Sequence, residues 1–525
     1  MRWNRKWSLL AVLTLVLMAP AMQAAAQELV VVHEVPIVEL DPLAGYINAP
    51  SPYEAGLLLY NFLVRFDSNL NIVPDLATEW SVSEDGRTWT FRLREGVVFH
   101  DGTPFNAHAV KFNLERSMDR EKNPLNRPLW DPLASVEVVD EYTVRVTTHN
   151  PFPTLLNTLA HGSAGIVSPA AVERYGAAFE TNPVGTGPYK LESFRPGAEV
   201  VLVRNEAYFG PRPALDRIVF RYVPDADARV AMLRSGQADI ATALSPQVAL
   251  ALRNTPNINV LSWPTLRTLG IGLNFLTPAL QDARVREAFN YAVDKQGLVR
   301  AIFMGEATVM DSPVAQNATG HATVFDYSYN PGRAAQLLEE AGWRLGPDGV
   351  RYKDGVPLSL TLIMAEGSYP NDLQVAQVVA NQLRAVGAEV QIWPVERASY
   401  WDYLKAPPSQ VEFDMFIWAF NPSNGDGAYA LSSLFKSNPD PNDVPLVWNI
   451  GWYSNPRVDE LLTQADRTVD PERRNALLRE VQEILAAENP YIWLYVEHRI
   501  NAARADVQGI KTLPVVFIDL SEARR

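Results

Sequence analysis

Residues 76–116 read LATEWSVSEDGRTWTFRLREGVVFHDGTPFNAHAVKFNLER, and this segment carries the clearest structural signals in the sequence. The pair Asp85-Gly86 is a turn signal between two runs of strand-forming residues. After the turn, apolar Trp89, Phe91 and Leu93 alternate with polar residues, which is the two-residue period of a strand with one buried face. The segment therefore predicts an antiparallel β-hairpin that packs on a core.

Further elements are predicted directly after this hairpin. Asn106 is a helix-capping residue, and Val110 and Leu114 lie four residues apart on one face of the helix that it would start. Beyond that helix, Asp140-Glu141 separates two runs in which apolar residues alternate, from 136 to 146. We expect a second hairpin there.

The later sequence alternates between strand and helix patterns. Predicted strands at 218–220 and 269–275 are followed by predicted helices at 226–235 and 282–304. Two more helices have clear start signals, in which a capping residue precedes a proline: Asn330-Pro331 and Asp470-Pro471. This alternation is typical of α/β architecture.

Composition narrows the class of protein. The 525 residues are 47% hydrophobic and 20% charged, which predicts a globular chain of two lobes or more. The absence of cysteine excludes disulfides, thiolate metal sites and a lipid-modified cysteine. The formal charge is −14, and loss of the three positive residues of the leader would lower it to −17, so nucleic acid is not an expected partner.

The first residues have the order of a secretory signal. Positive residues at 2–6 precede an apolar run from Leu9 to Ala19 and the small residues Ala24 to Ala26. A membrane anchor is the competing interpretation, but this run is shorter than the roughly 20 residues that a spanning helix needs. We expect a signal peptide at 1–26, cleavage near Ala26 and a mature protein free in the periplasm.

Catalytic and metal-binding motifs do not account for the chain. His161-Gly162-Ser163 lacks the surrounding Gly-x-Ser-x-Gly elbow, and Gly185-Thr186-Gly187 lacks the spacing of a phosphate loop. His100 and His108 flank a predicted turn, and no further histidine lies nearby in the sequence to complete a ligand set. We therefore predict no enzymatic activity, no cofactor and no metal site.

Aromatic residues are the more informative feature. The chain has 13 Trp, 19 Tyr and 20 Phe, several of them beside glycine, asparagine or aspartate. Most of these rings are expected in the core, but rigid rings in polar loops are also typical of ligand clefts. This composition favours a binding protein.

Several segments together resemble the peptide-type solute-binding proteins of ABC importers, a family with dipeptide-, oligopeptide-, glutathione- and nickel-binding members. The similarity covers nearly the whole mature chain and is strongest in the segment quoted first. In the family's order, the matching segments are LATEWSVSEDGRTWTFRLREGVVFHDGTPFNA, NPVGTGPYKL, NEAYFGPRPALDRIVFRYVPDADARVAMLRSGQADI, VREAFNYAVDK, YNPGRAAQLLEEAGW and WYSNPRVDELLTQA.

The resemblance implies an α/β, two-lobed periplasmic binding protein fold with an extra subdomain in the first lobe. Lobe I would comprise 27–265 and 488–525, with the inserted subdomain at about 48–178, and lobe II would comprise 266–487. The ligand would lie between the lobes, and hinge closure around it would be the functional motion.

The segment from Met415 to Phe435 looks most like the glutathione-binding branch. That branch has a Trp, a Gly-acid pair and an Ala-Leu-Ser run, matched here by Trp418, Gly425-Asp426 and Ala430-Leu431-Ser432. The dipeptide and oligopeptide branches place an aspartate three residues after the Trp to hold the ligand's ammonium, and here that position is Asn421. Either Asp426 supplies the counter-charge or the ligand lacks a simple ammonium group.

We therefore predict a ligand site formed by Arg267, Trp401, Trp418, Asn421 and Asp426. Arg267 would clamp a ligand carboxylate and Asp426 an ammonium, although an exposed arginine and a turn aspartate are the ordinary alternatives.

The expected partners are a small-molecule or short-peptide ligand and the permease subunits of an ABC transporter in the inner membrane, and we expect a monomer. An opine, an oligosaccharide or a metal chelate is the alternative class of solute, and a secreted hydrolase is the alternative class of protein.

Overall fold

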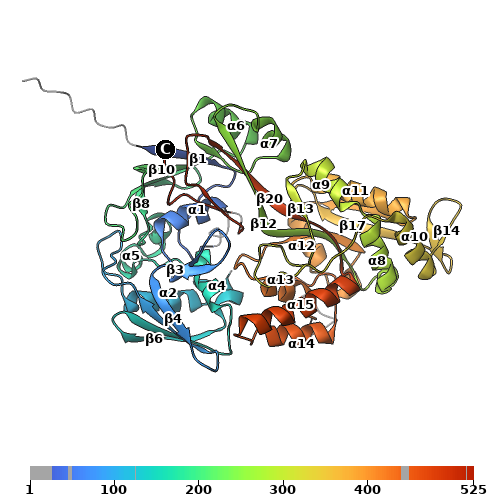
Figure 1. The fold of residues 1–525 in the computed structure, drawn as a ribbon, viewed down its shortest axis with the longest axis horizontal. Helices are drawn as coiled ribbons and strands as arrows, with labels where there is room; N and C mark the ends of the chain where they lie inside the picture. Colours follow the sequence, from blue (N-terminus) through green and yellow to red (C-terminus); the bar gives the residue numbers. More distant parts are fainter. Residues whose placement is uncertain (1–26, 45–49, 124–125, 439–447, 516) are drawn as a thin grey trace, which may run out of the picture.

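The computed structural model describes residues 27–44, 50–123, 126–438, 448–515 and 517–525. These residues form two lobes that lie side by side and are joined by two long strands (Figure 1). The predicted signal peptide at 1–26 lies outside the described residues. Within the described ranges, no helix is long and apolar enough to cross a membrane.

One mixed sheet extends through both lobes, in the order β18-β17-β19-β12-β20-β11-β1-β10-β9-β8, with β13 beside β20. Its strand β1 is parallel to β10 and β11 and is almost entirely apolar, as a strand buried on both faces must be. The strands are β1 (Glu28–His33), β8 (Tyr189–Arg195), β9 (Glu199–Arg204), β10 (Arg217–Tyr222), β11 (Ile240–Ala241), β12 (Ile258–Leu273), β13 (Ala307–Val309), β17 (Ser359–Ala365), β18 (Glu389–Val395), β19 (Met415–Phe420) and β20 (Tyr491–Arg504).

The lobes are connected by β12 and β20, which pair with each other along most of their length. Their register shifts between Pro264 and Thr268, opposite His498 and Val496. The first half of β20 pairs with β12 and β13, and its second half pairs with the start of β12. The expected lobe boundaries at 265 and 488 stay predictions.

The inserted subdomain contains the two predicted hairpins, both of which are confirmed. Its antiparallel sheet has the order β4-β5-β7-β6, and Val82 pairs with Trp89 across the predicted turn. The helix after Asn106 is also confirmed, since the Asn106 side chain accepts hydrogen bonds from its first turn. The elements are β4 (Ala77–Val82), β5 (Thr88–Leu93), α2 (Ala107–Met118), α3 (Arg127–Trp130), β6 (Leu133–Asp140), β7 (Thr143–Thr148), α4 (Leu155–Leu159) and α5 (Pro169–Tyr175). The exact limits of the subdomain at 48 and 178 stay a prediction.

Two glycines allow the chain to return from this subdomain to the main sheet. A Cβ atom on Gly185 would lie 2.2 Å from the Leu59 carbonyl oxygen, and one on Gly187 would lie 2.3 Å from that of Leu58. The Gly187 amide instead donates a hydrogen bond to Leu59, 2.9 Å away. Any side chain at Gly185 or Gly187 would push this segment away from the C-terminal end of helix α1 (Pro50–Leu59).

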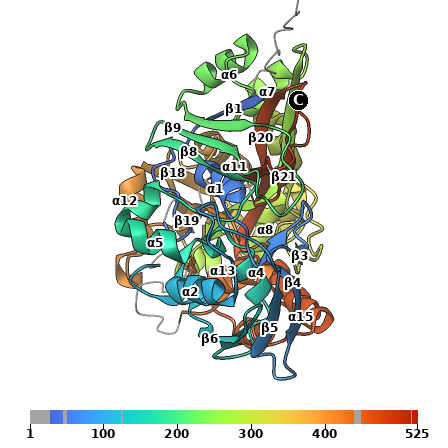
Figure 2. The same cartoon turned by 90° about the vertical axis from the view of Figure 1, so that its left-hand side faces the viewer.

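The remaining elements of lobe I surround its part of the main sheet. Seen from the lobe I side, α6 lies at the top of the molecule and the inserted subdomain at the bottom (Figure 2). The remaining elements are α1 (Pro50–Leu59), β2 (Val64–Phe66), β3 (Ile72–Pro74), α6 (Ala226–Ser235), α7 (Pro246–Leu252), β21 (Lys511–Leu513) and β22 (Phe517–Asp519).

Lobe II packs its helices on its own part of the sheet. The prediction of a single helix at 282–304 is wrong. The segment forms two helices, and Asp294 caps the second one by accepting a hydrogen bond from the Gly297 amide. The helices predicted to start at Pro331 and Pro471 are confirmed. The elements are α8 (Ala283–Ala292), α9 (Lys295–Phe303), α10 (Pro331–Glu340), β14 (Arg344–Leu345), β15 (Arg351–Lys353), β16 (Val356–Pro357), α11 (Asp372–Ala385), α12 (Arg397–Leu404), α13 (Gly427–Phe435), α14 (Pro456–Ala465) and α15 (Pro471–Glu488).

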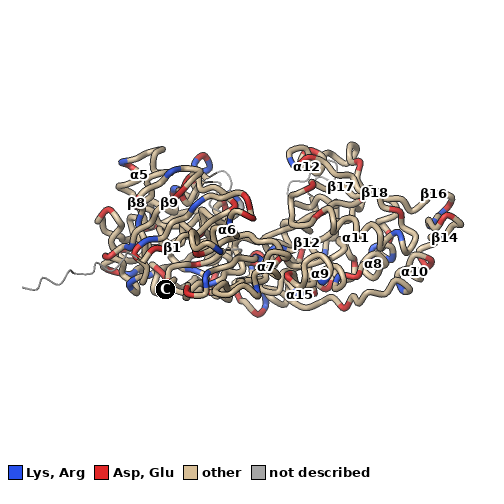
Figure 3. The backbone as a smooth tube through the Cα atoms, turned by 90° about the horizontal axis from the view of Figure 1, so that it is seen from above, with Lys and Arg blue, Asp and Glu red and all other residues tan. Residues whose placement is uncertain are grey.

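The two lobes touch each other beyond the connecting strands. A continuous cluster of buried apolar residues extends from the inserted subdomain into lobe II. At this contact the Asn157 side chain donates a hydrogen bond to the Asn424 carbonyl, 3.0 Å away, and Gly425 lies against Phe66. Positive and negative residues are interspersed over both lobes (Figure 3).

Candidate functional site

The carboxyl ends of three strands form one edge of lobe II. Strand β17 is parallel to both β18 and β19, so all three end on the same side of the sheet. The chain leaves this edge through 366–371, through the start of α12 and through 421–426. Because Thr268 of β12 pairs with Phe420, the edge lies at the crossing between the lobes. Ligands of open α/β sheets bind outside such carboxyl ends.

Three tryptophans form a cluster at this edge. The ring centroids of Trp401 and Trp418 are 5.3 Å apart, and Trp448 lies 5.3 Å from Trp401 and 5.7 Å from Trp418. The Lys405 ammonium lies 5.4 Å and 5.7 Å from the ring centroids of Trp401 and Trp448. The ring planes of Trp401 and Trp418 are 86° apart, so the cluster offers single ring faces rather than one flat surface. An aromatic face beside an exposed cation can stack on a ligand, and the cation can attract the ligand's negative charge.

Two polar atoms at this edge are buried without a hydrogen-bond partner among the described residues. They are the Nε1 donor of Trp418 and the Oδ1 acceptor of Asn421, which follows the end of β19. Leaving a buried polar group unpaired costs about 1–3 kcal/mol. A polar ligand could form hydrogen bonds with both atoms, since one is a donor, the other is an acceptor, and their residues are three apart in the sequence.

Arg267 lies at the crossing between the lobes, and its guanidinium already forms an ion pair within the protein. Its Nη1 atom is 3.2 Å from the Glu497 carboxylate, and its side chain is 36% exposed. Burial raises the pKa of Tyr369, while the hydrogen bond from the Ala419 amide and the positive charges of Arg267 and Arg397 oppose that rise. The predicted role of Arg267 as a carboxylate clamp stays a prediction.

The structure does not leave Asp426 free to act as the expected counter-charge. Its side chain is 1% exposed, and its two oxygens lie 2.7 Å and 2.9 Å from the Arg474 guanidinium. The same carboxylate caps α13 by accepting a hydrogen bond from the Ala428 amide. Both oxygens are therefore engaged within the protein, because a bidentate arginine uses the fork of the carboxylate.

A cavity of about 570 Å³ lies between the inserted subdomain and lobe II. Apolar groups such as Phe152 and Tyr429 form much of its wall, and Lys436 and Asp466 add charges of both signs, 4.0 Å apart. The Ser432 hydroxyl is buried here without a partner in the part of the chain that is described. An apolar wall with a few convergent polar groups is the usual lining of a small-molecule site.

The facing edge of lobe I also carries paired charges. Glu34 follows the carboxyl end of β1, and its carboxylate lies 2.8 Å from Arg499 of β20 and 2.7 Å from the Thr242 hydroxyl. Burial alone would raise the pKa of Glu34, but Arg499 and its other neighbours outweigh burial and lower it to about 2. This charge is therefore already neutralised next to the strand crossing.

The structure thus brings together four of the five predicted residues. Trp401 and Trp418 are in contact, Asn421 ends the same strand, and Arg267 lies one residue from the position that pairs with Phe420. Sequence reasoning missed Trp448 and Lys405. Lys405 follows Trp401 by four residues, a spacing that would put the two side chains on one face of a helix, but no helix was predicted there, and no sequence signal pointed to Trp448.

Comparisons with known proteins identify the family of this chain. Residues 71–442 match the model of the bacterial extracellular solute-binding proteins, family 5 Middle. The glutathione-binding protein GsiB of Escherichia coli (strain K12) is 32% identical over 503 residues, which cover 95% of this chain and 94% of GsiB. GsiB of Salmonella typhimurium is 33% identical over 525 residues, which cover 99% of this chain and 98% of that relative.

Solved structures show the same two-lobed fold. NikA from Brucella suis, solved in complex with Fe(III)-EDTA, has a TM-score of 0.83 and 28% identity, and the match covers 95% of this chain and 99% of NikA. The α/β two-lobed fold predicted from the sequence is confirmed. The chain belongs to the family of bacterial extracellular solute-binding proteins, family 5.

Proposed function

We propose that this protein captures a short peptide or glutathione-like solute between its lobes in the periplasm and delivers it to the permease of an ABC importer. The observation that carries the proposal is the aromatic and polar edge of lobe II at the strand crossing, in a chain that aligns with glutathione-binding relatives over nearly its whole length. Export by a cleaved signal peptide and a monomeric state are part of the same proposal.

The charges at the edge favour a solute with excess carboxylate. Arg397 at the start of α12 and Lys405 at its end supply positive charge near the aromatic cluster, Arg267 is partly paired with Glu497, and Asp426 is engaged with Arg474. Glutathione carries two carboxylates and one ammonium, so it fits this balance better than a dipeptide with one of each. Charge-assisted hydrogen bonds to guanidinium are the strongest polar contacts available here.

Calorimetric titration tests the proposal. Reduced glutathione should bind with measurable heat, and an alanyl dipeptide should bind more weakly. Trp418→Ala should weaken glutathione binding at least tenfold, because it removes a stacking face and a donor, whereas Trp80→Ala in β4 is a matched control that should not. Absence of heat with peptides and glutathione, together with binding of an opine, an oligosaccharide or a metal chelate, would reject this solute class.

A further inference from the structure

A second cavity, of about 560 Å³, lies wholly within lobe I. Its walls come from α1, the β2–β3 hairpin, the loop at 208–214, Leu513 and the C-terminal residues 519–524. None of its lining residues belongs to lobe II, although one of them, Phe66, also lies against Gly425 of lobe II.

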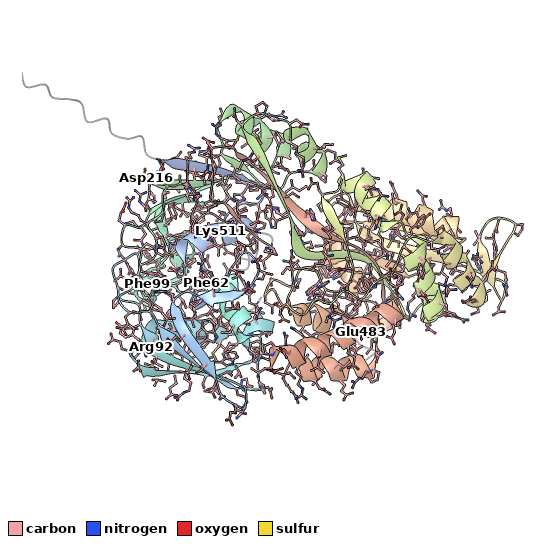
Figure 4. All side chains as sticks on the ribbon, in the orientation of Figure 1. Phe62, Arg92, Phe99, Asp216, Glu483 and Lys511 are labelled. Carbon is pink, nitrogen blue, oxygen red and sulfur yellow. The ribbon has the colours of Figure 1, made fainter. Side chains whose placement is uncertain are left out.

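The views place this cavity away from the aromatic edge. In Figure 2, β3 and β21 lie on one side of the molecule, and α12 and β18 lie on the opposite side. Figure 4 shows Phe62, which lines the cavity, inside lobe I. The cavity is therefore separate from the proposed solute site.

Three guanidiniums at this cavity have no ion-pair partner among the described residues. They belong to Arg65, which is exposed on β2, to Arg94 and to Arg524 near the C-terminus. Arg94 donates a hydrogen bond from Nε to the Asp75 carbonyl, 3.3 Å away, and its guanidinium carbon lies 5.1 Å from the centre of the Phe209 ring. An arginine has five N–H donors, so the terminal N–H groups of Arg94 remain for an anion.

The carboxylates at the cavity are largely engaged elsewhere. Asp75 is buried and accepts hydrogen bonds from the Asn61 side chain and the Phe62 amide, both 2.9 Å away. Asp519 accepts a hydrogen bond from the Ser521 amide, 2.8 Å away, and Glu522 is paired with Lys511. The positive charges of Arg65, Arg94 and Arg524 thus have no ion-pair partner among the described residues.

Aromatic groups supply the rest of the recognition surface. Tyr53, Phe62, Phe66 and Tyr208 line the cavity beside Phe209. Flat rings beside guanidiniums can hold a planar apolar body while the cations hold its charged group. We propose that this cavity is a second ligand site, which takes a small organic anion with an aromatic body, independently of the solute site.

Titration calorimetry with 2-naphthoate as the probe tests this proposal. The purified protein should bind 2-naphthoate, and 2-naphthalenemethanol, which has the same ring without the charge, at least tenfold more weakly. Arg65→Gln and Arg94→Gln should each weaken 2-naphthoate binding at least tenfold, because each removes charge-assisted hydrogen bonds. Arg87→Gln, at an exposed arginine of the subdomain turn, is the control that should bind like the parent.

Competition separates this site from the solute site. Saturating glutathione should leave the affinity for 2-naphthoate unchanged, and Trp418→Ala should not alter it. No binding at millimolar 2-naphthoate, equal affinity in both arginine variants with unchanged thermal unfolding, or displacement by glutathione would each overturn the proposal. Because Arg65 lies exposed on a short strand, Arg65→Gln should fold as the parent does.

Discussion

Replacing Asp426 by asparagine separates a structural role from a ligand-binding role. Asparagine has the same shape and can still cap α13 by accepting a hydrogen bond from the Ala428 amide. The substitution therefore removes mainly the negative charge, which leaves Arg474 buried with a side chain that is 7% exposed. Removing one partner of a buried ion pair costs about 3–5 kcal/mol, so Asp426→Asn should lower the free energy of unfolding by about that amount.

Urea-induced unfolding followed by circular dichroism measures this change. An exposed pair provides the matched control: Arg457 and Glu480 lie 2.8 Å apart with side chains 48% and 44% exposed. Glu480→Gln should cost less than about 1 kcal/mol, because water screens exposed ion pairs. Adding Arg474→Met to Asp426→Asn should restore part of the lost stability, since it removes the unpaired buried charge.

The opposite pattern would refute this reasoning. If Asp426→Asn unfolded at the same urea concentration as the parent but lost its affinity for the solute, the ion pair with Arg474 would not be structural. Asp426 would then return to the solute site as the partner of a ligand ammonium.

Three further changes should follow from the structure. Ligand should shift the tryptophan emission of the parent, and Trp401→Phe should reduce that shift because the Trp401 ring contacts Trp418; an identical shift in the variant would remove Trp401 from the site. Burial raises the pKa of Glu54 to about 8 from 4.5, so the folded protein retains a proton that the unfolded chain loses between these values, and stability falls as the pH rises through this window. Urea unfolding of Glu54→Gln and of the parent at pH 5 and at pH 8 measures this effect. The free energy of unfolding of the variant minus that of the parent should be more than about 1 kcal/mol higher at pH 8 than at pH 5, and an equal difference at both pH values would contradict the raised pKa of Glu54. Gly187→Ala should destabilise by about 1–3 kcal/mol because its Cβ would lie 2.3 Å from a backbone carbonyl of α1, whereas Gly332→Ala, which has room, should not.

The elements that sequence predicts well are those fixed by neighbouring residues. The hairpin at Asp85-Gly86 and the helix after Asn330 depend on turn and capping chemistry within a few residues, and both are present. The prediction of one helix at 282–304 is wrong for a local reason. The Asp294 side chain caps a second helix there, and the apolar stripe, which continues past this residue, gives no sign of the break. A continuous apolar pattern does not show where backbone hydrogen bonding is interrupted.

The site was harder to predict because its decisive contacts join distant parts of the chain. Asp426 is a plain turn residue in sequence, and only the fold brings Arg474 to both of its oxygens. The predicted strand at 269–275 likewise gave no sign that β12 begins at Ile258 and carries the chain between the lobes through Pro264. Proline is unusual inside a strand, and here it marks the register shift at the crossing.

Mass spectrometry of the small molecules released when the purified protein is denatured tests the central claim most directly. The account predicts release of a short peptide or a glutathione-like compound carrying excess carboxylate, in an amount close to that of the protein, and reduced release from Trp418→Ala. Release of an oligosaccharide or a metal chelate in the same amount would contradict it.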